Sequence, residues 1–266
     1  MPTELVTNLP TELPIELKVV LLVLAGVVAG VMNSLAGGGT LLTFPALIFA
    51  GLPAIAANAT NSLALLTGIG TSIWGYRREL ATQRKWALRF AAPSLLGGLV
   101  GALLLLNTGE SQFRLLVPYL ILFATILFTF QGPILRLLEI EAQAIGRSRR
   151  GVALALLFQF GVAVYGGYFG AGIGILMLAA LGVLGHTDMH QMNSVKVLQA
   201  FLINFVAAIL FIASGQIYWM ECLMIACGAA VGGAIGPALG RRVGPMAVRA
   251  VVSIIGFSIG IYFLLR

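Results

Sequence analysis

The chain has 266 residues, of which 59% are hydrophobic and 9% carry a charge, and its mean hydropathy is +1.01. A soluble domain carries roughly a quarter charged residues, so this composition excludes an ordinary soluble protein and predicts an all-α polytopic membrane protein surrounded by lipid. The net charge of +7 does not indicate a nucleic-acid partner, because the basic residues gather in short loops between apolar runs, as membrane topology requires.

Ten apolar segments follow one another along the chain. In the first half they span residues 18–36, 40–50, 55–76, 87–106 and 115–130, and in the second half 151–169, 173–184, 191–213, 220–240 and 247–265. A membrane-spanning helix needs about 20 residues, so the second segment of each half is too short to cross. Only glycine-rich residues 37–39 and 170–172 separate these segments from the ones before them. We therefore expect each half to consist of a broken helical hairpin and three transmembrane helices.

Small residues recur at helical spacing in both halves. Gly97 and Gly101 are four residues apart, as are Gly232, Gly236 and Gly240. This spacing places each set on one helical face and predicts close packing against a neighbouring helix.

A constant shift of about 135 residues brings the two halves into register. It places Asn58 on Asn193 and Arg114 on Arg249, and it pairs glycines along every segment. This regularity predicts an internal duplication. The predicted domains are an extracytoplasmic N-terminal segment (1–17), a first transmembrane repeat (18–131), a cytoplasmic linker (132–150) and a second transmembrane repeat (151–266).

The charged loops predict that the two repeats have opposite orientations. The basic loop 77–89 aligns with residues 212–224, which contain no Lys or Arg. Conversely, Arg241 and Arg242 align with the uncharged residues 106–107. Basic loops stay in the cytoplasm, so equivalent loops lie on opposite sides of a bacterial inner membrane. Inverted-topology repeats of this kind are typical of secondary transporters.

Polar residues gather after the glycine-rich breaks, where they would lie at membrane depth. Polar groups at that depth are candidate functional groups. Each restarted helix directs its partly positive N-terminus into the break, which favours an anion there. The candidate substrate-binding residues are Gly37, Gly38, Gly39, Asn58, Thr60, Asn61, Ser62, Gly172, Asn193, Ser194, Lys196 and Gln199. Asn33, Thr40, Tyr165, Tyr168 and Asn204 are further polar residues near the breaks.

Structural roles compete with this interpretation. The glycines serve equally well for tight packing, and the amides and hydroxyls for hydrogen bonds between helices. Lys196 lies early in its segment, where a lysine can extend to the cytoplasmic surface.

Other functional classes leave weaker traces in the sequence. There is no HExxH motif and no nucleotide-binding glycine loop, and Cys222 and Cys227 share one apolar run, which predicts no disulfide framework. His186, Asp188 and His190 resemble a metal cluster but share one short loop without a further ligand nearby. We therefore expect no catalytic residue, no metal and no cofactor.

Specific sequence motifs add a family resemblance. The first half reads Gly-Val-Met-Asn-Ser-Leu-Ala-Gly-Gly-Gly-Thr at residues 30–40, followed by Phe-Pro at 44–45, Gly-Leu-Pro at 51–53 and Ala-Asn-Ala-Thr-Asn-Ser at 57–62. The second half reads Gly-Gly-Tyr-Phe-Gly-Ala-Gly at 166–172 and Asn-Ser-Val-Lys at 193–196. In order and spacing these motifs resemble the TauE/SafE family of sulfite and organosulfonate exporters. The resemblance implies an inner-membrane permease that moves a small sulfur-containing anion, usually outward.

Two rival functions remain open at this point. One is an importer of a small carboxylate or other metabolite, with or without proton coupling, and the other is a membrane scaffold subunit without a transport site. No Asp or Glu lies deep inside a predicted span, which disfavours proton coupling through a buried carboxylate. The sequence leaves open the transport direction, the coupling ion and whether the chain forms a homo-oligomer.

Overall fold

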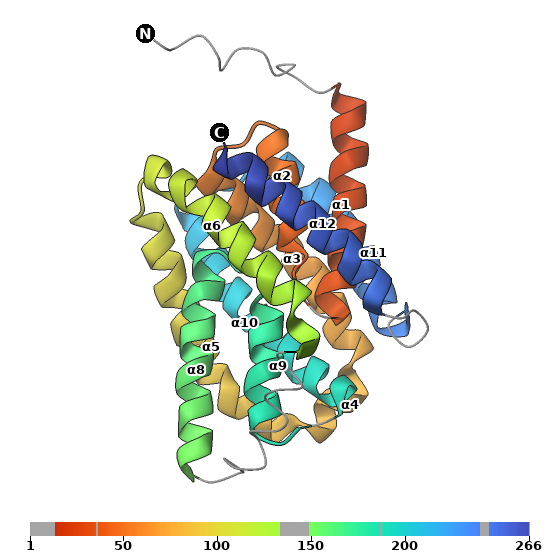
Figure 1. The fold of residues 1–266 in the computed structure, drawn as a ribbon, viewed down its shortest axis with the longest axis vertical. Coiled ribbons are helices and arrows are strands. Elements are labelled where there is room, and N and C mark those ends of the chain that lie inside the picture. Colours follow the sequence, from red (N-terminus) through yellow and green to blue (C-terminus); the bar gives the residue numbers. More distant parts are fainter. Residues whose placement is uncertain (1–13, 36, 134–148, 187, 240–244, 266) are drawn as a thin grey trace.

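The computed structural model is all-helical in the residues that it describes, 14–35, 37–133, 149–186, 188–239 and 245–265, with the backbone alone for 245–252. Figure 1 shows the helices packed into one bundle. They are α1 (Ile15–Leu35), α2 (Thr40–Phe49), α3 (Ala54–Gly75), α4 (Arg77–Thr82), α5 (Arg84–Leu106), α6 (Glu110–Thr129), α8 (Arg149–Tyr168), α9 (Ile173–Val183), α10 (Met189–Ala213), α11 (Trp219–Leu239) and α12 (Pro245–Leu264).

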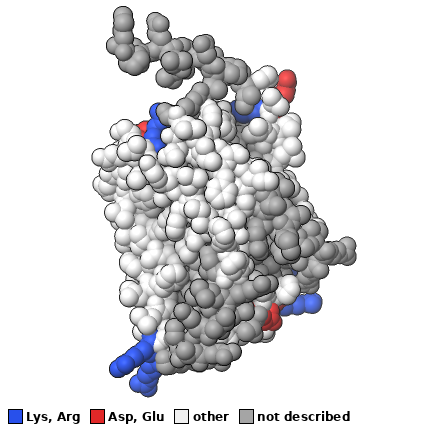
Figure 2. All heavy atoms as spheres, viewed as in Figure 1, with Lys and Arg blue, Asp and Glu red and all other residues white. Residues whose placement is uncertain are grey.

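The protein is a multi-pass membrane protein. Six of the described helices are long and apolar enough to cross a membrane, namely α1, α5, α6, α8, α10 and α11. Large apolar side chains such as Leu24, Leu96 and Leu157 are exposed on the outside of the bundle, where lipid would cover them. In Figure 2 the charged side chains gather at the two ends, and the described surface between them is uncharged on this face.

Both predicted helix breaks are present. α1 ends at Leu35 and α2 begins at Thr40, while α8 ends at Tyr168 and α9 begins at Ile173. The short helices α2 and α9 have 10 and 11 residues, too few to span the hydrocarbon core. In the breaks, two glycines of each half adopt positive φ: Gly37 (89°), Gly38 (93°), Gly170 (81°) and Gly172 (77°). Glycine adopts this conformation without the steric cost that a side chain would bring, which explains the composition of the breaks.

Helices of the first half pack mainly against helices of the second half. α11 packs against both α1 and α3 of the first half. In the same way, α5 packs against both α8 and α10 of the second half. α6 lies against α12, and α3 against α10. The bundle therefore has no boundary between an N-terminal and a C-terminal unit.

Glycines permit these close contacts, as their spacing predicts. A Cβ added to Gly97 would lie 2.6 Å from the carbonyl oxygen of Phe160 in α8, and one added to Gly101 would lie 2.8 Å from a backbone nitrogen of the same helix. Gly232 and Gly236 of α11 face α1 in the same way. The packing role assigned to these glycines is confirmed; Gly240 lies outside the described residues.

The helices repeat along the chain in the same order and at a nearly constant spacing. The starts of α3, α5 and α6 precede those of α10, α11 and α12 by 135 residues each. This is the shift that aligns the sequence with itself.

A carboxylate fixes the start of α3, the helix that carries Asn58 and Asn61. Glu110 at the beginning of α6 accepts hydrogen bonds from the backbone N–H groups of Ala54 (2.5 Å) and Ile55 (3.1 Å). A negative charge at this position satisfies N–H groups that have no partner within the helix and also opposes the helix dipole. These bonds tie the start of α3 to the start of α6.

Candidate functional site

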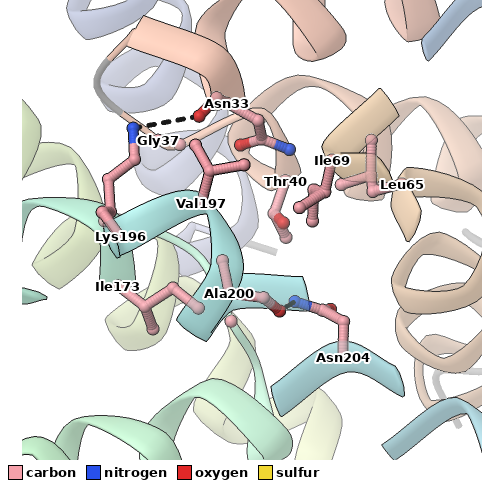
Figure 3. Close-up of a pocket in the computed structure, with 13 residues that line it drawn as sticks. Asn33, Gly37, Thr40, Leu65, Ile69, Ile173, Lys196, Val197, Ala200 and Asn204 are labelled. Carbon is pink, nitrogen blue, oxygen red and sulfur yellow. Dashed lines mark hydrogen bonds between the residues drawn. The ribbon is translucent and has the colours of Figure 1, made fainter. Parts of the chain in front are cut away.

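The two helix breaks touch each other inside the bundle. A Cβ added to Gly37 in the first break would lie 3.0 Å from Cα of Gly174, the second residue of α9. Beside this contact is a cavity of about 30 Å³, shown in Figure 3. Its lining consists of Asn33, Gly37, Gly38, Thr40, Leu65, Ile69, Gly170, Ile173, Gly174, Lys196, Val197, Ala200 and Asn204. The cavity is therefore built from both breaks together with the middle of α3 and α10.

Lys196 is the full positive charge at this cavity, and its side chain is buried with 1% exposure. Its ammonium donates hydrogen bonds to the backbone carbonyls of Asn33 (3.1 Å) and Ser34 (3.3 Å), and Figure 3 shows the first of these bonds. These carbonyls belong to the last turn of α1, where helical partners are lacking and the dipole is negative. The alternative that Lys196 extends to the cytoplasmic surface is wrong, because the interrupted end of α1 offers it acceptors inside the bundle.

Asn33 and Thr40 bring polar side chains from the first break. Asn33 Oδ1 accepts a hydrogen bond from the backbone N–H of Gly39 (2.9 Å), which ties the end of α1 to the start of α2. Thr40, the first residue of α2, lines the same cavity. Figure 3 shows both side chains on the side of the cavity opposite Asn204.

The polar face of α3 reaches both breaks. Asn61 Nδ2 donates to Thr40 Oγ1 (3.2 Å) at the first break, and Asn58 Nδ2 donates to the carbonyl of Tyr168 (3.0 Å) at the end of α8. The ends of the two broken helices are thus bound by opposite halves. α8 is bound by an amide of α3, and α1 by the lysine of α10.

The electrostatics of the cavity favour an anion. Its lining contains one lysine and no Asp or Glu. Two helices, α2 and α9, begin at its wall, and helix N-termini carry partial positive charge. Among the described residues, no group of three His, Cys, Asp or Glu residues is placed to hold a metal ion. Asp188 instead caps α10 by accepting from the N–H groups of His190 and Gln191.

Three of the predicted site residues line the cavity: Gly37, Gly38 and Lys196. Several others make hydrogen bonds elsewhere. Thr60 accepts from the N–H of Tyr218, Ser62 donates to Asn58 O, Ser194 donates to Gln191 O, and Gln199 donates to Ala87 O. Gly39, Asn58, Asn61, Gly172 and Asn193 are also outside the lining. The Oδ1 atoms of Asn58 and Asn193 are buried without a hydrogen-bond partner among the described residues.

Some lining residues were absent from the predicted set. Asn33, Thr40 and Asn204 were noted as polar residues near the breaks, whereas Leu65 and Ile69 carried no polar signal. Helical spacing offers a signal that finds more of them. Lys196, Ala200 and Asn204 recur every four residues, and so do Leu65 and Ile69, which places each set on one helical face.

Comparison with known proteins finds a family model and relatives that are named as membrane transporters. The sequence model of the family described as "Sulfite exporter TauE/SafE" matches residues 22–263. A "Probable membrane transporter protein" of Haemophilus influenzae is 29% identical over 235 residues, covering 85% of this chain and 86% of the relative. The "Probable membrane transporter protein YfcA" of Escherichia coli K12 is 30% identical over 226 residues, covering 84% and 81%. A "Probable membrane transporter protein ORF9" of Sinorhizobium is 25% identical over 242 residues, covering 88% and 87%. No solved structure matches the chain significantly.

Proposed function

Because the chain belongs to the sulfite exporter TauE/SafE family, we propose that it is a secondary transporter for a small sulfur oxyanion, either sulfite or an organosulfonate. The direction we propose is outward across the bacterial inner membrane. The relatives named above are called transporters rather than enzymes, and the proposal adds a substrate and a direction to that function.

The observation that carries this proposal is a buried cavity with a lysine where two helix breaks touch. The Gly37–Gly174 contact brings both restarted helices to one place, and Lys196 adds a full charge there. A buried lysine without a carboxylate partner costs free energy. The hydrogen bonds to α1 offset part of that cost, and a bound anion would offset more.

Inverted repeats would let this cavity open alternately to the two sides. In Figure 1, α1 starts at the upper end of the bundle and α8 at the lower end, so the two equivalent helices run in opposite directions. The 135-residue shift also exchanges the contacts: α1 on α11 becomes α8 on α5. This symmetry supports alternating access by movement of the two halves around a central site.

The proposed orientation predicts which face each loop occupies. Ala81 and Gln216 are equivalent positions in the two repeats, 135 residues apart. If the repeats are inverted, a cysteine introduced by Ala81→Cys and one introduced by Gln216→Cys should react from opposite sides of the membrane. Impermeant thiol reagents added to intact cells measure this, in a background that lacks Cys222 and Cys227. The reagent should label position 216 in intact cells and position 81 only after lysis. Labelling of both from one side would contradict the inverted repeat.

The proposed substrate predicts which anions the protein moves across a membrane. In proteoliposomes with an imposed potential, we expect sulfite to move faster than acetate. Export of each negative charge gains about 2.3 kcal/mol per 100 mV when the cell interior is negative. Faster movement of acetate than of any sulfur anion would favour the carboxylate importer and refute the assignment. An absence of all flux would favour a scaffold.

A further inference from the structure

A chain of three buried side chains ends at the cavity. The hydroxyl of Thr43 donates to Asn61 Oδ1, and Asn61 Nδ2 donates to Thr40 Oγ1 at 3.2 Å. Thr43, Asn61 and Thr40 are exposed by 0%, 1% and 7%. Of the three, only Thr40 lines the cavity.

The direction of each bond in this chain depends on where the single Thr43 hydroxyl proton goes. The carbonyl oxygen of Gly39 is also 3.1 Å from Thr43 Oγ1, but it already accepts the backbone N–H groups of Leu42 and Thr43, so we assign the Thr43 proton to Asn61 Oδ1. An amide oxygen only accepts hydrogen bonds and an amide nitrogen only donates them. With the Thr43 proton on the amide oxygen, Asn61 turns its nitrogen toward Thr40. Thr40 Oγ1 therefore accepts from Asn61, and its own proton remains free. Among the described residues the Thr40 hydroxyl has no further hydrogen bond.

Asn33, near the end of α1 on the other side of the first break, also has its amide orientation set by a hydrogen bond. Its Oδ1 is occupied by the N–H of Gly39, so its Nδ2 is left to donate. Together with the Lys196 ammonium, the polar side chains around the first break present N–H or O–H groups rather than lone pairs. This arrangement suits an oxyanion, whose oxygens only accept.

We propose that Asn61 and Thr43 are positioning residues that hold the Thr40 hydroxyl as a hydrogen-bond donor to the transported oxyanion. The inference rests on the proposed function, since it assumes that the anion occupies this cavity. It assigns Asn61 a role through Thr40 rather than direct contact with the substrate. In the second repeat the aligned positions carry Ile175, Lys196 and Leu178, so this relay belongs to the first half alone.

The test is a double-mutant cycle on sulfite binding and flux. Thr40→Val removes the donor and should weaken sulfite affinity by about tenfold, which corresponds to 1.4 kcal/mol. Thr40→Ser keeps the hydroxyl and should retain affinity. Thr43→Val frees the Asn61 amide to turn its oxygen toward Thr40, and should weaken sulfite affinity severalfold. In a Thr40→Val background, Thr43→Val should have no further effect, because coupled residues are non-additive.

A polarity reversal at Asn61 sharpens this test. Asn61→Asp keeps the shape of the side chain but offers only acceptors to Thr40, so the Thr40 proton should turn toward the carboxylate and away from the cavity. We expect a loss of sulfite affinity at least as large as that of Thr40→Val. If the added charge prevents folding, as a thermal unfolding assay would show, the uncharged Thr43→Val cycle decides.

A control variant and two contradicting outcomes separate failure of the relay from failure of the proposed function. Thr67→Val is the matched control, because it also removes a threonine hydroxyl, from α3 itself. That hydroxyl bonds to the carbonyls of Ala64 and Ala226, and Thr67 does not line the cavity, so sulfite affinity should be unchanged. If Thr43→Val lowers affinity by the same factor with and without Thr40→Val, the relay is refuted while sulfite transport stands. If the unmodified protein neither binds nor moves any sulfur oxyanion, the proposed function fails, and the relay with it.

Discussion

Replacing Gly37 with alanine is expected to abolish most sulfite flux. Gly37 has a φ of 89°, where an L-residue with a side chain costs about 1–2 kcal/mol. The added Cβ would also lie 3.0 Å from Cα of Gly174, a backbone atom that cannot rotate away. The two breaks would have to separate, and the cavity between them would lose its shape. We expect flux to fall by tenfold or more, which corresponds to about 1.4 kcal/mol.

Gly51→Ala is the matched control for this effect. Gly51, in the turn between α2 and α3, has a φ of 95°, and an added Cβ there meets no atom within 4 Å. Both variants therefore place a side chain at a similar positive φ, but only Gly37→Ala forces the breaks apart. Thermal unfolding should show a loss of stability from this strain in both variants and a further loss in Gly37→Ala from the displaced breaks, whereas flux should fall in Gly37→Ala alone. Equal flux in the two variants would mean that contact between the breaks is irrelevant to transport.

Much of the helical architecture follows from the sequence because lipid demands long apolar segments, and their interruptions are conspicuous. The glycine-rich breaks and the packing glycines were predicted for this reason. Helix bounds were less accurate at polar ends. α5 begins at Arg84 and α6 at Glu110, each a few residues before the apolar segment, because a first helical turn in the interface carries charge. The six-residue helix α4 has no apolar face that would indicate it.

The approach of the two breaks was predicted, whereas the residues that line the cavity between them were predicted only in part. The sequence suggested that the breaks would meet, and the contact between Gly37 and Gly174 shows that they do. It did not show which side of each polar helix faces the cavity. A helical turn advances 5.4 Å, so Lys196 reaches the cavity whereas Asn193, about one turn earlier, lies outside the lining. Such a difference depends on how α10 packs against α5 and α3, which no local pattern encodes.

Loss of the Lys196 charge should be the most damaging single change to anion transport. Lys196→Met removes the positive charge while keeping a side chain of similar length and apolar character. Hydrogen bonds to charged groups contribute about 1.5–3 kcal/mol, so we expect sulfite flux to fall by about tenfold to a hundredfold. The carbonyls of Asn33 and Ser34 also lose their donor, which should lower thermal stability. Lys196→Gln separates the two effects, because it keeps N–H donors without the charge. It should recover part of the stability but not the flux.

Lys18→Met serves as the control for removing a lysine from the bundle. The Lys18 ammonium pairs with Glu221 at 2.6 Å between the starts of α1 and α11, and neither residue lines the cavity. A partly exposed pair of this kind contributes about 0–1 kcal/mol, so stability should change little and flux should persist. If Lys196→Met retained the flux of Lys18→Met while losing stability, Lys196 would only bind the end of α1. The anion would then require a different source of positive charge. The starts of α2 and α9 are the candidates, because their N–H groups remain at the cavity when the lysine is gone.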